Sequence, residues 1–190
     1  MTFDYAAARQ IMVDSQVRPN DVTDLAIQHA MRTIDRERLC PADKAYLAYA
    51  DCEIEYAPGR FLMRPRDVSK LIHAARPKPG ERALAIAAPY AAAVLEAVGL
   101  AVTRLDEGEL AAAPAGSFDV IVSEGAVSEP PAAWLKALAA GGRLAVTVRK
   151  GPAGKVRLYV RTGDDVGHRE VFEAAPPVLP GFEPAAGFVF

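Results

Sequence analysis

An acidic residue at the end of an apolar run is one candidate for binding a small ligand. Glu124 follows the run DVIV (119–122) within FDVIVSEG. If this run is a parallel strand, Glu124 lies at its carboxyl end, the edge at which open α/β sheets bind ligands. The alternative interpretation is that Glu124 is an ordinary surface acid. Position alone favours neither interpretation.

Three arginines could contact an acidic substrate, and one aspartate could line its cleft. Arg60, Arg64 and Arg66 form a short basic cluster, and a guanidinium group can bind a carboxylate through paired hydrogen bonds. Such a cluster can also be a solvated face. Asp51 and Tyr49 could line a cleft for that substrate. Alternatively, Asp51 is an acid at a helix end and Tyr49 is packed in the core.

Nucleophilic catalysis and metal binding are not predicted. Cys40 has no histidine arrangement that would activate its thiol, and Ser69 and Lys70 have no recognisable base. Two cysteines do not make a disulfide framework, so Cys40 and Cys52 are expected to be reduced. The three histidines show no metal-ligand spacing: His29, His73 and His168. The catalytic residues stay unassigned, and no metal site is expected.

Composition limits the class of protein. The 190 residues are 51% hydrophobic, which suffices for the core of one compact unit. The formal net charge of −2 indicates neither a nucleic-acid partner nor an anionic membrane surface. The first ten residues contain Asp4 and no long apolar core, so no signal peptide is predicted. No uncharged apolar run reaches about 18 residues, the length of a membrane span. We therefore expect a soluble cytoplasmic protein.

Residues 1–75 are predicted to form a helical region. Helical spacing marks one side of a first helix at Tyr5, Ala8, Met12 and Ser15. This helix is expected to end near Arg18, because Pro19 follows. Further helices are predicted over 27–34, 42–50 and 65–75. Thr23 or Asp21 is a candidate cap for the first of these.

Between residues 76 and 190 strands alternate with helices. Strands are expected at 82–88, 100–105, 118–125 and 143–149, and helices at 89–99 and 130–142. Strand–helix–strand order predicts parallel pairing in a doubly wound sheet. The segments 155–163 and 168–174 alternate more in polarity and are expected to form a terminal antiparallel pair. The proline-rich stretch 175–190 is predicted to be a loose tail.

Four stretches occur in the same order as in one known family. They are MVDSQVRPNDVTD (12–24), the Arg-Glu-x-x-x-Pro element DRERLCP (35–41), AYAD (48–51), and the block from FDVIV to RLAVTV (118–148). The first of them is fairly specific, whereas the Gly-Gly-Arg-Leu part of the last is shared by many methyltransferases. Together they cover most of the chain. The sequence resembles the bacterial protein-L-isoaspartate O-methyltransferases.

The resemblance implies a methyl transfer from S-adenosylmethionine to the isoaspartyl carboxylate of a damaged protein or peptide. The sulfonium already activates the methyl group, so the protein has to align donor and carboxylate and exclude water. The resemblance places Ala87 in the donor loop and Tyr90 just after it. It also places Glu124 near the donor. Asp106 or Glu107 would accept hydrogen bonds from the ribose, although DEGE (106–109) could also be an exposed acidic turn.

The donor loop and the following strand depart from the family pattern. Ala87, Ala88 and Pro89 stand where the family has a glycine-rich loop that is about two residues longer. The alanine Cβ atoms hinder close approach of a ligand to the backbone, and Pro89 has no N–H to donate to it. Only GELAAAPAG (108–116) separates the second strand from FDVIV. This stretch is too short for the helix and strand that the family has there, because a parallel crossover needs about a dozen residues.

The substrate segment also departs from the pattern. In GRFLMRP (59–65), Met63 and Arg64 precede a proline where the family usually has a serine and a glutamine, and a thioether is a poor hydrogen-bonding group. By position, Arg60, Met63 and Asp51 are the candidate substrate-binding residues.

We therefore predict an α/β protein with a Rossmann-like methyltransferase sheet. The sheet is mostly parallel, ends in an antiparallel pair and lacks one βα unit. It is formed by residues 76–190, and the helical region 1–75 packs on it. Two functions remain open. One is a divergent isoaspartyl O-methyltransferase that uses S-adenosylmethionine on a protein substrate. The other is an inactive relative without a cofactor, which binds a partner or forms a homodimer through the sheet edge that the missing unit exposes.

Overall fold

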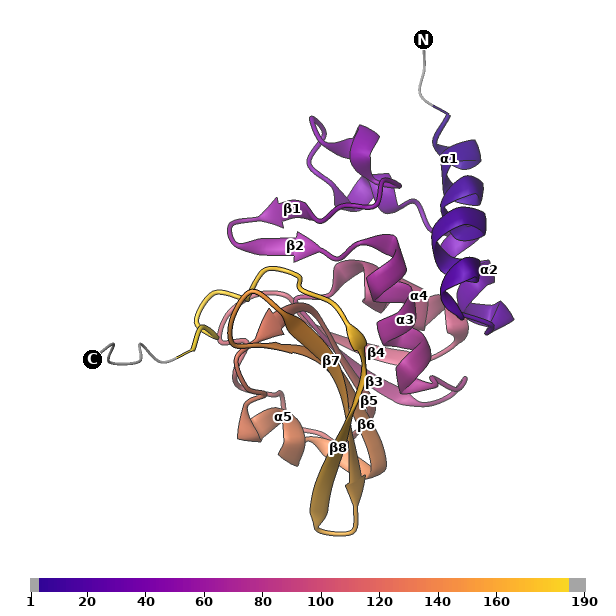
Figure 1. Cartoon of the computed structure of the whole chain (residues 1–190). Helices are drawn as coiled ribbons and strands as arrows, with labels where there is room; N and C mark the ends of the chain where they lie inside the picture. The colour runs from indigo at the N-terminus through magenta and orange to yellow at the C-terminus, as the bar shows by residue number, and fades with distance from the viewer. Residues whose placement is uncertain (1–3, 185–190) are drawn as a thin grey trace, which may run out of the picture.

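A six-stranded sheet forms the centre of the computed structural model, which describes residues 4–184. The strand order is β4-β3-β5-β6-β7-β8 (Figure 1). Four strands pair in parallel: β3 (Arg82–Ile86), β4 (Ala101–Leu105), β5 (Phe118–Val127) and β6 (Leu138–Arg149). β3 and β5 are apolar because both of their faces are buried, as is usual for parallel strands, whereas β4 at the edge is largely exposed.

The sheet ends in an antiparallel pair on one side and in the parallel strand β4 on the other. β7 (Gly154–Thr162) pairs antiparallel with β6, and β8 (Asp165–Glu173) pairs antiparallel with β7. Residues 106–117, all of them described, contain no helix or strand, so β4 is an edge strand. The predicted fold class, mostly parallel with a terminal antiparallel pair and one βα unit missing, is confirmed.

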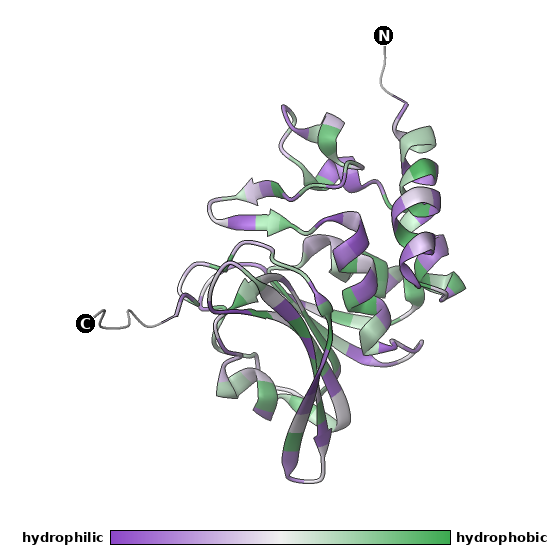
Figure 2. Cartoon of the chain, viewed as in Figure 1, coloured by the Kyte–Doolittle hydropathy of each residue, from purple (hydrophilic) through white to green (hydrophobic). Residues whose placement is uncertain are grey.

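One face of the sheet is covered by helices. α3 (Pro65–Ala75) and α4 (Pro89–Val98) pack on the strands, with α2 (Leu25–Thr33) and α1 (Tyr5–Met12) outside them (Figure 1). Both inner helices begin at a proline, whose fixed φ suits the first helical position. α4 stops at Gly99, which has a φ of 104° and ends the helix without a Cβ clash. Figure 2 shows hydrophobic residues concentrated where the helices and strands meet.

The other face is covered by α5 (Ala132–Lys136), residues 106–117 and the C-terminal segment 174–184. Leu179 and Phe182 of this segment are 1% and 8% exposed, and the Phe182 ring lies 5.4 Å from that of Trp134. The prediction of a loose tail is therefore wrong for 175–184, and residues 185–190 lie outside the described part. The helix expected over 130–142 is also wrong beyond Lys136, because the chain joins β6 at Leu138.

The N-terminal region contains a hairpin that the sequence analysis missed. β1 (Ile54–Ala57) and β2 (Arg60–Leu62) pair antiparallel. The helix expected over 42–50 is only the 3₁₀ turn Ala45–Leu47. α1 continues through a π-helical turn, Val13–Val17, and a 3₁₀ turn, Arg18–Asn20.

The cap of α2 is Asp24 rather than Thr23 or Asp21, because its carboxylate accepts hydrogen bonds from the N–H groups of Ala26 and Ile27. The helices of the described residues are too short to cross a membrane; the longest, α3, has 11 residues.

Candidate functional site

The carboxylate of Glu124 lies inside the protein, at the carboxyl end of the parallel strands. Glu124 belongs to β5 and has no exposed surface, so it is not a surface acid. Its Oε1 accepts a hydrogen bond from the Ala91 N–H at 2.6 Å, and its Oε2 accepts one from the Met63 N–H at 3.2 Å. Ala91 is in the first turn of α4, where free N–H groups and the helix dipole favour an anion. Here the carboxyl group of Glu124 takes that position.

A buried arginine provides a positive charge in the same region. Arg36 has no exposed surface; its Nε donates to the Ala48 carbonyl at 2.8 Å and its Nη2 to the Met63 carbonyl at 2.6 Å. The guanidinium carbon lies 4.4 Å from the centre of the Tyr90 ring. Within the described residues the Nη1 atom has no hydrogen-bond partner. The backbone of Met63 thus links the two side chains, with its N–H on Glu124 and its C=O on Arg36.

Burial dominates the electrostatics of Glu124. Loss of solvent raises the pKa of its carboxyl group, whereas the Arg36 charge and the backbone N–H donors act in the opposite direction. A buried charge without such partners costs several kcal/mol, on the order given by mutational studies of buried ion pairs. The group formed by Arg36, Met63, Tyr90 and Glu124 therefore holds together the hairpin, α4 and the sheet.

The residues after β3 lie in the core. Ala87 and Ala88 have no exposed surface. Ala87 has a φ of 44°, and its N–H donates to the Leu105 carbonyl at 2.9 Å. Tyr90 is also fully buried, which raises the pKa of its phenol, and its hydroxyl has no hydrogen-bond partner within residues 4–184. Backbone and side chains of this turn are thus covered by other parts of the chain.

Two polar atoms without partners lie beside the hairpin. Asp106 follows β4, and its Oδ1 is buried without a hydrogen-bond partner in the described chain. The same holds for the hydroxyl of Tyr56, on β1. Burial raises the pKa of Tyr56, and the negative charges of Glu124 and Asp106 raise it further. A cavity of about 420 Å³ lies between the hairpin turn, residues 108–111 and the C-terminal segment.

The candidate substrate residues are in three different settings. Arg60, the first residue of β2, lines the 420 Å³ cavity. Met63 is fully buried, and its backbone is bound to Glu124 and Arg36. Asp51 is exposed in the bend before β1. Within the described residues no hydrogen bond or ion pair joins Asp51 to another candidate, so the structure brings together Met63, Tyr90 and Glu124 but not Asp51.

The other arginines of the basic cluster are paired. Arg64 Nε lies 2.7 Å from a carboxylate oxygen of Glu53, and Arg66 Nε lies 2.8 Å from one of Asp67. Tyr49 is 7% exposed; its hydroxyl donates to Glu37 and accepts from Arg9. Tyr49 is thus packed, as the alternative interpretation proposed. No three His, Cys, Asp or Glu side chains are arranged to hold a metal ion in the part of the chain that the structure describes.

Sequence reasoning missed Arg36, Tyr56 and Leu179. Arg36 belongs to the Arg-Glu-x-x-x-Pro element, but neighbouring residues carry no sign that its charge is buried. Leu179, in the proline-rich stretch, packs against Gly125, where a Cβ would lie only 2.6 Å from its side chain. For Tyr56, the Pro-Gly pair at 58–59 between two apolar runs was a usable hairpin signal.

Comparison with known proteins identifies relatives that match over most of the chain. No protein-family model matches. A protein-L-isoaspartate O-methyltransferase of Methylorubrum populi is 34% identical over 175 residues, which are 78% of this chain and 82% of that protein. One of Methylorubrum extorquens is 32% identical over 178 residues, covering 80% and 77%.

Solved structures share the fold. A protein described as a protein-L-isoaspartate O-methyltransferase of Plasmodium falciparum, in complex with S-adenosyl-L-homocysteine, matches with a TM-score of 0.71 at 14% identity, covering 90% of this chain and 97% of that one. Another protein-L-isoaspartate O-methyltransferase matches with a TM-score of 0.73 at 17% identity, covering 95% and 67%. With the sequence relatives, these findings show that the chain belongs to the protein-L-isoaspartate O-methyltransferase family.

Proposed function

We propose that this chain is a non-catalytic member of its family, in which parts of the chain fill the donor site and the scaffold acts as a binding module. The observation that carries this proposal is the Glu124 carboxylate at the N terminus of α4. Helix N termini at the carboxyl edge of such sheets are ready-made sites for ligand anions. Here an internal carboxylate uses the Ala91 N–H that a ligand anion would need.

The turn at 87–89 supports the same proposal. A nucleoside donor would need to lie against bare backbone there, but Ala87 and Ala88 carry Cβ atoms that are buried and Pro89 has no N–H. Leu179 covers Gly125 on the adjoining strand. We infer that the residues present do not fit S-adenosylmethionine in the position that the family resemblance implies.

A second candidate function is the methyl transfer for which the relatives are named. The unpartnered Asp106 Oδ1 and the cavity lined by Arg60 favour it. A bound S-adenosylmethionine would supply an activated methyl group. In that case Asp106 would accept hydrogen bonds from the ribose hydroxyls, and Arg60 would pair with the acceptor carboxylate of a protein or peptide. For both candidate functions we propose, from the sequence, that the protein acts in the cytoplasm.

Calorimetric titration with S-adenosyl-L-homocysteine separates the two functions. We expect no binding at micromolar concentrations, with the Methylorubrum populi relative as positive control. A micromolar isotherm for this chain would overturn the proposal and support methyl transfer. Transfer of labelled methyl groups to an isoaspartyl peptide, compared with the matching aspartyl peptide, would then test the acceptor.

A further inference from the structure

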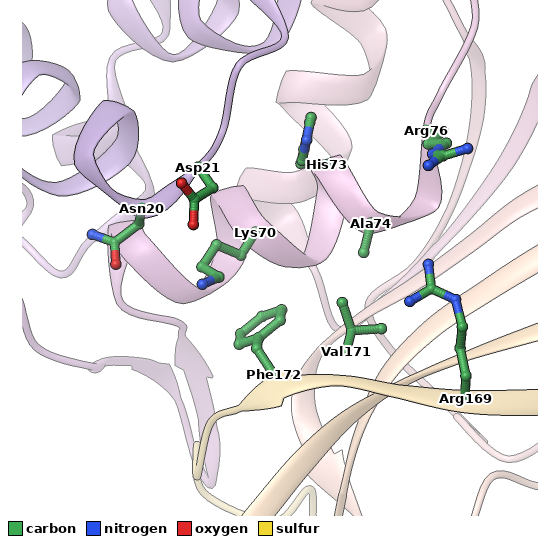
Figure 3. Close-up of a pocket in the computed structure, with 9 residues that line it drawn as sticks. All are labelled: Asn20, Asp21, Lys70, His73, Ala74, Arg76, Arg169, Val171 and Phe172. Carbon is green, nitrogen blue, oxygen red and sulfur yellow. The ribbon is translucent and has the colours of Figure 1, made fainter.

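A second cavity lies between α3 and β8, away from the site described above. Its volume is about 250 Å³, and it shares no lining residue with the cavity at Arg60. Figure 3 shows its two ends: Arg76 and Arg169 lie at one, and Lys70 with Asn20 and Asp21 at the other. The floor between them is apolar and consists of Ala74, Val171 and Phe172.

The charge of this cavity is mostly uncompensated. Lys70, Arg76 and Arg169 form no ion pair with any acid within residues 4–184, and Asp21 is the one acid among the lining residues. The Lys70 ammonium lies 5.0 Å from the centre of the Phe172 ring, which places it over the apolar floor. Three cations facing one acid favour an anionic ligand.

The backbone holds Arg76 in a conformation that glycine adopts more readily. Arg76 has a φ of 48° and Asp21 a φ of 63°; these are two of the three non-glycine residues with positive φ in the described chain. Each of them ends a helical segment, α3 and the 3₁₀ turn Arg18–Asn20, where a left-handed residue is common. Arg143, which forms an ion pair with Glu81 at 2.9 Å, donates to the Arg76 carbonyl at 2.7 Å and so fixes the turn that presents the Arg76 side chain.

We propose that this cavity binds an organic anion that consists of an oxyanion and a ring-sized apolar body. The oxyanion lies at the end of the cavity that Arg76 and Arg169 line, since guanidinium groups bind carboxylate or phosphate. The body lies on Ala74, Val171 and Phe172. A cavity of about 150 Å³ holds benzene, so 250 Å³ has room for a ring and its acid group. This inference is independent of whether a methyl donor binds at the sheet edge.

The test is titration of the full chain with 3-phenylpropionate and phenyl phosphate, by calorimetry and by NMR of the Val171 and Ala74 methyl groups. We expect saturable binding of at least one acid, and much weaker binding of 3-phenylpropanol and acetate, which lack the charge or the body. The two acids separate carboxylate from phosphate as the preferred group. Equal binding of the neutral alcohol, or no saturable binding of either acid, would overturn the proposal.

Three variants check the location of the site. Arg169→Gln and Arg76→Gly should each weaken binding about tenfold or more, since each removes a charge-assisted hydrogen bond. Arg76→Gly should at the same time raise the unfolding midpoint, because it relieves the positive φ, so lost binding cannot be assigned to misfolding. Arg38→Gln, at an 80% exposed arginine elsewhere, is the charge-matched control and should bind as the parent does. Unchanged affinity in Arg169→Gln and Arg76→Gly would contradict the assignment.

Discussion

At the scale of single residues, Glu124 and Arg36 are charged side chains without solvent contact. Their hydrogen bonds go to backbone groups of Ala91, Met63 and Ala48. These partners lower the cost of burying the two charges, although the Nη1 atom of Arg36 has none within residues 4–184, and removal of one charge leaves the other uncompensated. The pair therefore makes the interior of this region sensitive to single substitutions.

Arg36→Met should destabilise the protein by about 3–5 kcal/mol, because Glu124 would lose its counter-charge while staying buried. Urea unfolding measures the change. Arg38→Met, at the exposed neighbour, should change stability by less than about 0.5 kcal/mol. Adding Glu124→Gln to Arg36→Met should recover part of the loss. A double variant as unstable as the sum of the singles would argue against coupling of the two charges.

The stability of the protein should depend on pH through Glu124. Burial raises the pKa of Glu124 above its ordinary value of 4.5, so the folded state keeps this proton to a higher pH than the unfolded chain does. Between those two pKa values the free energy of unfolding falls as pH rises. Glu124→Gln should lack this fall in urea unfolding from pH 4 upward. Glu107→Gln, at an exposed acid, is the control; parallel curves for Glu124→Gln and the parent would contradict a raised pKa.

At the scale of elements, the C-terminal segment is the part whose packing matters most to the site. Leu179 is 1% exposed, and its side chain lies on Gly125 in β5. Val178 forms a parallel bridge with Ala126, and Phe182 packs on Trp134. The segment thus seals the sheet face that α5, only five residues long, leaves uncovered.

Leu179→Ala should destabilise the protein by about 2–5 kcal/mol, since it removes a buried side chain from a packed face. Thermal unfolding followed by circular dichroism measures the shift. The matched control is Leu25→Ala, because Leu25 is 76% exposed and its loss should shift the midpoint little. Equal shifts for the two variants would indicate that the segment is not packed in solution.

Elements with a clear period were predictable from the sequence, and elements that depend on distant partners were not. The apolar spacing in 65–75 and the Pro89 and Gly99 boundaries predicted α3 and α4 correctly. The helix expected over 130–142 stops early, because pairing of Leu138 with Phe118 draws the following stretch into β6. Val178 and Leu179 pack on the apolar face of the sheet that α5 leaves uncovered. The residues next to them in the sequence do not reveal this contact.

The candidate site was predictable only in part, for the same reason. The position of Glu124 beside the carboxyl end of β3 followed in part from the apolar run before it, although β5 itself continues to Val127. Its burial, and its contact with α4, depend on Met63 and Arg36, which are far away in the sequence. The cavity lined by Lys70, Arg76 and Arg169 lies between α3 and β8, which are about 100 positions apart in the chain. No local pattern in the sequence connects Lys70 or Arg76 with Arg169.

At the scale of the whole molecule, the two edges of the sheet differ in protection. β8 carries four charged residues: Asp165, Arg169, Glu170 and Glu173. β4 carries one, Arg104, whose guanidinium group pairs with Glu96 on α4 at 2.7 Å. Charged side chains on an edge strand discourage pairing between molecules. β4 is thus the edge more open to a second copy of the chain.

We predict that the chain forms a homodimer through β4. Light scattering coupled to size exclusion should give twice the 20.3 kDa mass of one chain at high concentration. Thr103→Lys, on the exposed part of β4, should shift the mass toward the monomer, because like charges would meet across the pair. Lys150→Gln, at an exposed lysine outside the strands, is the control. A monomer at every concentration would contradict this prediction.

The backbone of Met63 has a consequence for how this sequence can diverge further. Its N–H and C=O bind Glu124 and Arg36, so loss of either charge alone leaves the other stranded in the interior. A substitution at either position alone is therefore unfavourable, and Arg36 and Glu124 are expected to be replaced together if they are replaced at all.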